Sequence, residues 1–275
     1  MIIISKLFVV ISLILILIPI PSSAYSKISD DFINLQKWTY WTKNQDPSCV
    51  PAIATYDGST TIAQLHLRGD SCIILPGNTE GANLEFNNAT GFGKYSIRMK
   101  TASAPLSDGL VNAFFIYSYR SQDDVSEIDF EMLSSEPEVV HNTIWTSQKN
   151  KVERKVNLVT GEVLMTRKCA IIGSGWNCRD LYNIPSKVSP LPNFNHTRNY
   201  YIYTFIWSRN SVKFYVSDDS GQKTTLWSYY DYRNIPYKPA KPTLELWHTN
   251  DWGQGINSPT NDVFVNYDWF SYTPN

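Results

Sequence analysis

In the stretch Ser126-Glu-Ile-Asp-Phe-Glu-Met-Leu133, apolar residues alternate with acidic ones. A period of two is typical of a β-strand, because successive side chains of a strand point to opposite faces. Further runs of strand length, bounded by turn residues, occur at 61–68, 94–100, 110–118, 200–207, 211–216 and 264–272. No segment of helical length carries a convincing apolar stripe. The pattern predicts an all-β sandwich of two packed antiparallel sheets.

Residues 1–24 have the features of a secretory signal peptide. Lys6 precedes an almost wholly apolar run from Leu7 to Ile18, and Ser22-Ser-Ala24 supplies small residues before a cleavage point. The alternative is an uncleaved anchor, but a membrane-spanning helix needs about 20 apolar residues, and prolines shorten this run. We therefore expect cleavage after Ala24 and secretion to the extracellular space or cell wall. No repeat or charged linker divides 25–275, which predicts a single domain.

The composition excludes some partners and favours another. The chain has 24 Lys and Arg against 25 Asp and Glu, a formal net charge of −1, so it offers no basic field for nucleic acid or an anionic membrane. Its 9 Trp and 17 Tyr offer flat apolar faces with polar tips, on which sugar rings stack. Core packing and strand propensity explain part of the same excess. We expect a polysaccharide partner, no membrane contact after cleavage of the signal, and a monomer.

The cysteines fit an oxidising compartment. Four cysteines allow three pairings, and proximity in sequence favours Cys49 with Cys72 and Cys169 with Cys178, the second pair closing a hairpin loop. A zinc site is the alternative, but the chain has no Cys-x-x-Cys, and its four histidines are scattered. Asn88-Ala-Thr and Asn195-His-Thr match the N-glycosylation acceptor pattern.

Three acidic residues carry the functional signal. In a strand, Glu127, Asp129 and Glu131 share one face, while the apolar residues between them pack inward. An ordinary half-exposed strand is the alternative, but neighbouring carboxylates repel one another and acidic residues are poor strand formers. Their proximity also raises at least one pKa, as a general acid at neutral pH requires. Retaining glycosidases use two carboxyl groups about 5–5.5 Å apart, and side chains leaning together on a curved strand suit that chemistry.

Glu127-Ile-Asp-Phe-Glu131 resembles the active-site strand of glycoside hydrolase family 16, with its Glu-x-Asp-x-Glu pattern. Other segments resemble further strands of that family in the same order: Gly91-Phe-Gly-Lys-Tyr-Ser-Ile-Arg-Met-Lys-Thr101, Val111-Asn-Ala-Phe-Phe-Ile-Tyr117, His141-Asn-Thr-Ile-Trp145, Leu244-Glu-Leu-Trp247, Asn250-Asp-Trp-Gly253 and Val265-Asn-Tyr-Asp-Trp-Phe-Ser-Tyr272. The resemblance implies a concanavalin A-like jelly roll with a glycan cleft across a concave sheet, and a retaining mechanism.

By this resemblance, Glu127 is the nucleophile, Glu131 the general acid/base and Asp129 their helper. The resemblance also implies residues that stack on or hydrogen-bond sugars, although Phe115 and Trp247 would equally suit a core: Phe115, Tyr117, Asn142, Trp145, Trp247 and Trp252. It implies no required cofactor and is compatible with a structural calcium ion, for which no loop identifies ligands.

The sequence departs from the lichenase pattern at positions that contact substrate in mixed-linkage glucanases: Asn83, Glu85, Val125, Ser126 and Glu245. The polymer and linkage therefore stay open. We expect a secreted endo-β-glucanase-like hydrolase. Two alternatives remain: a cell-wall transglycosylase that uses the same residues, and a non-catalytic lectin-like sandwich.

Overall fold

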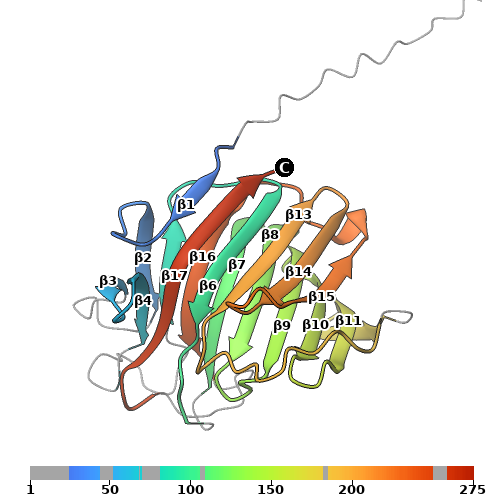
Figure 1. Ribbon diagram of the computed structural model, residues 1–275. Helices are drawn as coiled ribbons and strands as arrows, with labels where there is room; N and C mark the ends of the chain where they lie inside the picture. The colour runs from blue at the N-terminus through green and yellow to red at the C-terminus, as the bar shows by residue number, and fades with distance from the viewer. Residues whose placement is uncertain are drawn as a thin grey trace, which may run out of the picture.

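The computed structural model describes residues 25–43, 52–67, 69, 81–105, 109–181, 185–249 and 259–275. In these ranges the chain forms two antiparallel sheets (Figure 1). The eight-stranded sheet has the order β15 (Lys223–Tyr229), β14 (Ser211–Ser217), β13 (Tyr201–Ser208), β6 (Gly93–Lys100), β17 (Val263–Pro274), β4 (Thr61–Leu67) and β3 (Ala52–Tyr56), with β1 (Ile28–Asp30) beside β17.

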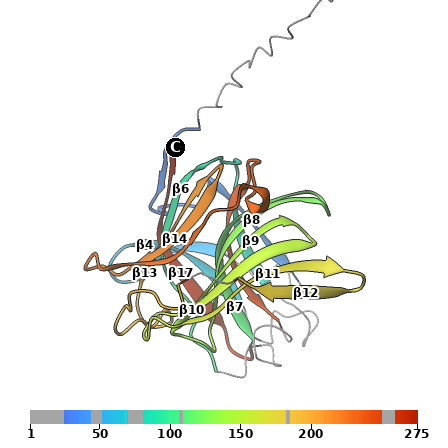
Figure 2. The ribbon, with the colours of Figure 1, turned by 90° about the vertical axis from the view of Figure 1, so that its right-hand side faces the viewer.

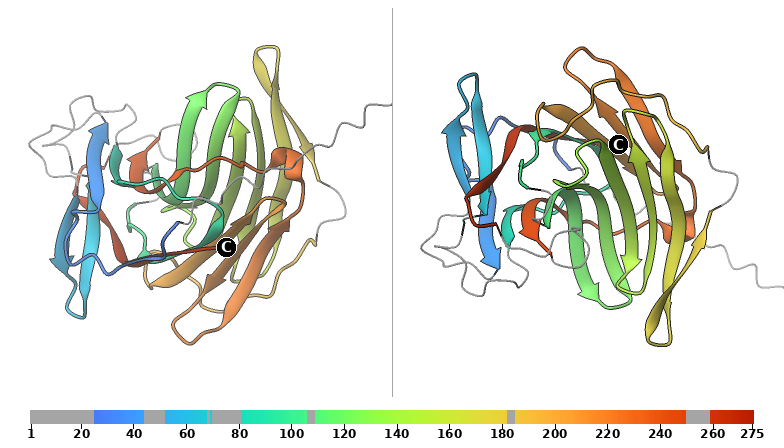
Figure 3. Two further views of the ribbon diagram at one scale, coloured as in Figure 1. Left: turned by 90° about the horizontal axis from the view of Figure 1, so that it is seen from above. Right: turned by 90° about the horizontal axis from the view of Figure 1, so that it is seen from below.

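The nine-stranded sheet has the order β12 (Gly175–Asp180), β11 (Val163–Ile172), β10 (Asn150–Asn157), β9 (Val139–Ser147), β8 (Asp124–Leu133), β7 (Leu110–Ser121), β16 (Lys241–His248), β5 (Gly81–Phe86) and β2 (Trp38–Lys43). Views from above and below show the two sheets as separate layers (Figure 3). Helical structure in the described ranges is limited to the short 3-10 turn η1 (Tyr232–Asn234). None of it is long and apolar enough to cross a membrane. The predicted β-sandwich is confirmed.

An aromatic core holds the two sheets together. Phe114 of β7 and Phe130 of β8 are fully buried and stack with ring centroids 6.5 Å apart. Phe130 also meets Phe214 of the opposite sheet edge to face, at 5.3 Å. Burying such side chains removes a large apolar area from water, which is the main favourable contribution to folding. The core therefore fixes which face of β7 and β8 points inward.

The hairpin between β7 and β8 sets the register of the acidic strand. Ser121 pairs with Asp124, so the turn holds only Gln122 and Asp123. A tight hairpin fixes strand pairing, and a slip of one residue would move every side chain to the opposite face. The short turn thus helps to hold the acidic residues of β8 on the outer face of the sheet.

The hairpin of β11 and β12 ends the nine-stranded sheet and extends away from the rest of the sandwich (Figure 2). Every residue of β12 is exposed. Cys169 and Cys178 are paired across the two strands by a disulfide, with Cα atoms 4.0 Å apart. This predicted pairing is confirmed, whereas Cys49 and Cys72 lie outside the described residues.

Candidate active site

Glu127, Asp129 and Glu131 lie in one line on the outer face of β8, and we call these three residues the acidic line. Asp129 is buried, with 2% of its surface exposed, and the two glutamates are half-buried. The core explains this placement, because Ile128 and Phe130 are fully buried between the sheets. The alternation read from the sequence therefore holds along the whole acidic stretch.

Each carboxyl group has a defined neighbour on both adjacent strands. Glu127 lies between Tyr117 and Trp145, Asp129 between Phe115 and Thr143, and Glu131 between Ala113 and His141. Paired residues in an antiparallel sheet point to the same face. The acidic line is thus flanked by aromatic side chains near Glu127 and by a small side chain next to Glu131.

Three recesses on this outer face meet at Glu127, and together we call them the cleft. The first, of about 300 Å³, reaches over β9 and β10 and includes Glu131, Trp145, Lys151 and Trp247. The second, of about 280 Å³, reaches over β16, β5 and β2 and includes Trp41, Asn83, Phe115, Tyr117 and Glu245. The third, of about 350 Å³, lies beside Val125. A long ligand could therefore extend in both directions from Glu127.

The acidic line holds protons at neutral pH. Burial raises the pKa of Glu127 to about 8, with the charges of Glu131 and Glu245 adding to the effect. Burial also raises the pKa of Glu131, to about 7, and raises that of Asp129 well above its ordinary value. Lys151 acts in the opposite direction on all three groups. Such close groups titrate together, so one ionised carboxylate favours protons on its neighbours.

Among the three acidic residues, Asp129 is the most deeply buried. Both of its oxygens are buried, and within the described part of the chain neither accepts a hydrogen bond of normal geometry. The Trp145 side chain faces it and favours the charged form, but burial dominates. A buried carboxylate without such partners is costly, so burial favours the neutral form of this carboxyl group.

Glu245 of β16 is a further carboxyl group in the cleft. It is paired with Ala113, which is paired in turn with Glu131. Burial raises the pKa of Glu245 to about 7, against opposing effects from Asn83 and Lys43. In the sequence, Glu245 stands out only as a departure from a family pattern. Its place in the alternating stretch Thr243-Leu-Glu-Leu-Trp247 was the available signal for an outward-facing acid.

His141 separates Glu131 from another charged group. Its Nε2 atom lies 3.2 Å from the Glu136 carboxylate, which also binds Lys155 Nζ at 2.7 Å. The hydrogen bond from His141 and the contact with Lys155 lower the pKa of Glu136 to about 2. The negative charge of Glu136 is thereby bound by His141 and Lys155, beside the acidic line.

The six residues predicted to bind sugar lie in different settings. Phe115, Tyr117, Trp145 and Trp247 line its recesses. Asn142 also borders the first recess, but it is fully buried in register with Phe130, and its amide donates to the backbone carbonyl of Asp129 at 3.4 Å. Trp252 lies outside the described residues. The sugar-binding roles of all six remain predictions.

Two further residues of the cleft, and a third that contacts its wall, were not predicted from the sequence. Trp41 of β2 is 46% exposed and lines the recess that contains Glu245. At the other end, Lys151 of β10 lines the recess that contains Glu131, and Trp176 of β12 contacts Trp145 edge to face. Neither β2 nor β12 is among the strand runs predicted from the sequence.

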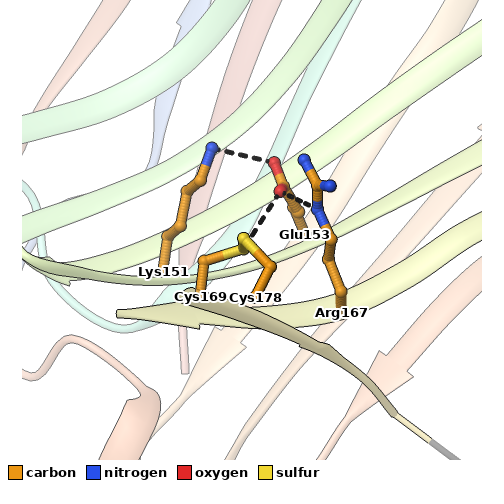
Figure 4. Close-up of a disulfide and its surroundings, with 5 residues drawn as sticks. All are labelled: Lys151, Glu153, Arg167, Cys169 and Cys178. Atoms are coloured by element: carbon orange, nitrogen blue, oxygen red, sulfur yellow. Dashed lines mark hydrogen bonds and ion pairs between the residues drawn. A yellow bond between two sulfur atoms is a disulfide. The ribbon is translucent and has the colours of Figure 1, made fainter. Parts of the chain in front are cut away.

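One cluster of potential metal ligands in the described residues consists of Glu153, Cys169 and Cys178. Figure 4 shows the two sulfurs bonded to each other beside the Glu153 carboxylate. Because a disulfide has no thiolate to offer, this cluster does not fit a metal ion. No group of described residues identifies ligands for the structural calcium ion with which the family resemblance is compatible.

The two glycosylation sequences lie in different settings. Asn88 is exposed, whereas the side-chain oxygen of Asn195 accepts hydrogen bonds from the backbone and hydroxyl groups of Thr197. Attachment of a glycan at either position remains a prediction.

Comparisons with known proteins agree on one group of enzymes. The sequence model described as "Glycosyl hydrolases family 16" matches residues 45–164. A "Beta-glucanase" of Bacillus subtilis (strain 168) is 25% identical over 187 residues, which cover 66% of this chain and 59% of the relative. A "Probable xyloglucan endotransglucosylase/hydrolase protein 6" of Arabidopsis thaliana is 24% identical, with 74% and 60% covered. The chain thus spans less than two thirds of these relatives.

Solved structures share the fold. A prokaryotic β-1,3-1,4-glucanase (lichenase) derived from a mouse hindgut metagenome superposes with a TM-score of 0.57 at 21% identity, covering 91% of this chain and 100% of that one. The Crh5 transglycosylase in complex with NAG gives a TM-score of 0.55 at 14% identity, covering 91% and 85%. Both hydrolases and transglycosylases are therefore built on this sandwich.

Proposed function

We propose that this chain, which matches the glycoside hydrolase family 16 model over residues 45–164, is a secreted retaining endo-glycosidase of that family that hydrolyses O-glycosidic bonds in a β-glucan-type polysaccharide. The observation that carries this proposal is the line of Glu127, Asp129 and Glu131, in which Glu127 lies where three recesses meet. A cleft that is open on both sides of the reacting groups suits cleavage within a long chain.

In the proposed reaction, the Glu127 carboxylate attacks the anomeric carbon while Glu131 gives its proton to the glycosidic oxygen that leaves. The glycosidic C–O bond breaks, and a covalent sugar ester forms on Glu127. Glu131, now ionised, takes a proton from water, and this water releases the sugar from the ester. Two inversions at the same carbon retain the original configuration.

The raised pKa values supply the proton that the reaction needs, whereas the separate roles of Glu127 and Glu131 follow from the family resemblance. The reaction needs one ionised carboxyl group and one protonated group close together. Burial and mutual repulsion raise the pKa of each member of the line, so protons stay on some of them at neutral pH. Lys151 supplies a positive charge that favours the ionised form of all three groups, so one carboxylate is stabilised within the line. With Asp129 and Glu131 neutral, the repulsion that disfavours ionised Glu127 is removed.

The second candidate is a transglycosylase, favoured by recesses on both sides of Glu127. The covalent ester would then pass to a sugar hydroxyl bound in the cleft instead of water. Product analysis with labelled oligosaccharide acceptors separates the two activities, because transfer alone creates labelled products longer than the acceptor.

The test is sugar release by the purified mature protein and by its Glu127→Gln variant. The panel holds mixed-linkage glucan, laminarin, xyloglucan, chitin–glucan and carrageenan. We expect the wild-type protein to release sugar from one β-glucan of the panel and the variant to release none. NMR should show that the products have the β configuration when they first form. Products of inverted configuration, or unchanged release by the variant, would refute the mechanism. Silence across the panel in both the release and the transfer assays would leave the lectin-like alternative.

A further inference from the structure

The cleft continues beyond the first recess towards β12. Lys151 is paired with both Trp145 on β9 and Cys169 on β11, and Cys169 is paired with Cys178 on β12. These pairs place the side chains of all four strands on the outer face that carries Glu127. The same face therefore leads without interruption from the reacting groups to the end of the sheet.

Trp176 stands at that end with its indole facing solvent. It is 46% exposed, although large aromatic side chains are usually mostly buried. Its ring centroid lies 5.7 Å from that of Trp145, and the two planes meet at 71°. Lys151 Nζ lies 4.9 Å from the Trp145 ring centroid and 5.3 Å from that of Trp176. Two aromatic faces and one amine thus form a single continuous surface.

Packing does not account for Trp176. All six residues of β12 are exposed, so this strand has no core of its own. The disulfide joins β12 to β11 two residues from Trp176. A disulfide across an edge hairpin limits the conformations of the strand that carries the exposed indole. The disulfide therefore fixes the position of a strand whose side chains are all exposed.

The polar groups beside the two indoles favour a neutral ligand rich in hydroxyl groups. The Glu153 carboxylate binds Lys151 Nζ at 2.9 Å and Arg167 Nε at 2.5 Å (Figure 4). Because Glu153 already pairs with both cations, an anion would have to compete with it. Sugar hydroxyls both donate and accept hydrogen bonds, and the C–H face of a sugar ring suits an exposed indole.

We propose that Trp176 is the outermost sugar platform of the cleft, where a ring distant from the cleaved bond stacks, and that the Cys169–Cys178 disulfide acts as its positioning element. Lys151, between Trp145 and Trp176, donates hydrogen bonds to hydroxyl groups of the same chain. This inference rests on the proposed function and adds a preference for long chains over short ones. The platform binds sugar and takes no part in bond cleavage.

The test measures binding separately from hydrolysis. In the Glu127→Gln background, calorimetry gives Kd for mixed-linkage glucan, xyloglucan and their oligosaccharides of increasing length. Affinity should rise again at the length that reaches Trp176, and Trp176→Ala should weaken binding of those long chains about tenfold. The matched control is Ile172→Ala, which removes another exposed side chain of the hairpin (67% exposed) from the opposite face.

The disulfide is tested by the Cys169→Ser/Cys178→Ser double variant. If the disulfide acts through Trp176, the double variant loses the same increase in affinity for long chains. Adding Trp176→Ala to the double variant then weakens binding no further. Circular dichroism checks that each variant keeps its sheets. Additive losses would show that the disulfide does not act through the indole.

The outcomes separate the two proposals. Length-dependent binding through Trp176, in a protein that releases no sugar, would keep the platform and reject hydrolysis. Sugar release with long-chain affinity unchanged within twofold in Trp176→Ala, relative to Ile172→Ala, would reject the platform and keep hydrolysis. A protein that neither cleaves nor binds any glycan of the panel would overturn both.

Discussion

Glu245 and Glu131 lie on the same face of the nine-stranded sheet, with Ala113 as the residue paired between them. The small methyl group leaves the two carboxyl groups without a bulky side chain to separate them. The negative charge of Glu245 raises the pKa of Glu131 and of Glu127. A residue far away in the sequence thereby helps to keep a proton on the proposed acid.

Replacing Glu245 with Gln should move the pH profile of kcat/KM to lower pH. Loss of the negative charge lowers the pKa of both Glu127 and Glu131, so the nucleophile ionises earlier and the acid loses its proton earlier. Both limbs of the profile should shift by roughly half a pH unit. Lys151 and Lys43 also face these groups and are unchanged in the variant. Limbs that stay at the wild-type pH would contradict this role of Glu245.

Asp129→Asn should slow turnover less than either glutamate substitution. The Asn side chain keeps the shape of a neutral Asp129, which is the form that burial favours, so kcat should fall about tenfold. Glu127→Gln or Glu131→Gln should reduce kcat by about a thousandfold or more, since each removes a group that reacts. Single-turnover kinetics measures all three variants. A loss in Asp129→Asn as large as in Glu127→Gln would mean that Asp129 must be ionised.

The acidic line should make the folded protein less stable as pH rises. The folded pKa values of about 8 for Glu127 and about 7 for Glu131 exceed their ordinary value of 4.5. Stability from such groups is fully present below the unfolded pKa and is lost as pH rises through the folded one. Tm should therefore fall by a few degrees between pH 4.5 and pH 8.

Glu127→Gln provides the control for that pH effect, because glutamine does not titrate. Thermal unfolding of this variant should show a smaller decline over the same interval than the wild type. An equal decline in both proteins would assign the effect to groups outside the acidic line.

Phe114 and Phe115 are adjacent, yet truncating the first should lower stability, whereas truncating the second should weaken substrate binding. Phe114 is fully buried between the sheets, so Phe114→Ala should reduce the free energy of unfolding by about 3–5 kcal/mol. Phe115 faces the cleft and is half-buried, so Phe115→Ala should cost about 1 kcal/mol or less and raise KM instead. Urea unfolding and steady-state kinetics measure the pair. A large stability loss in Phe115→Ala with unchanged KM would contradict its place in the cleft.

Several features of this protein could be read from the sequence because they depend on neighbouring residues. The period of two in the Ser126–Leu133 stretch placed three acids on one face, since side-chain direction in a strand is a local property. Short separation likewise predicted the Cys169–Cys178 pair, which the structure contains. The apolar partners of the acids, such as Phe130, followed from the same alternation.

Strand order and burial decided the remainder, because both join segments that are distant in the chain. Insertion of β16 between β5 and β7 brings Glu245 beside Glu131, and no local pattern specifies that neighbour. The ends of the sheet place Trp41 and Trp176 far along the same outer face. The sequence predicted that neighbouring acids raise at least one pKa, but burial is the largest cause for all three groups, and burial depends on every strand that packs around a carboxyl group.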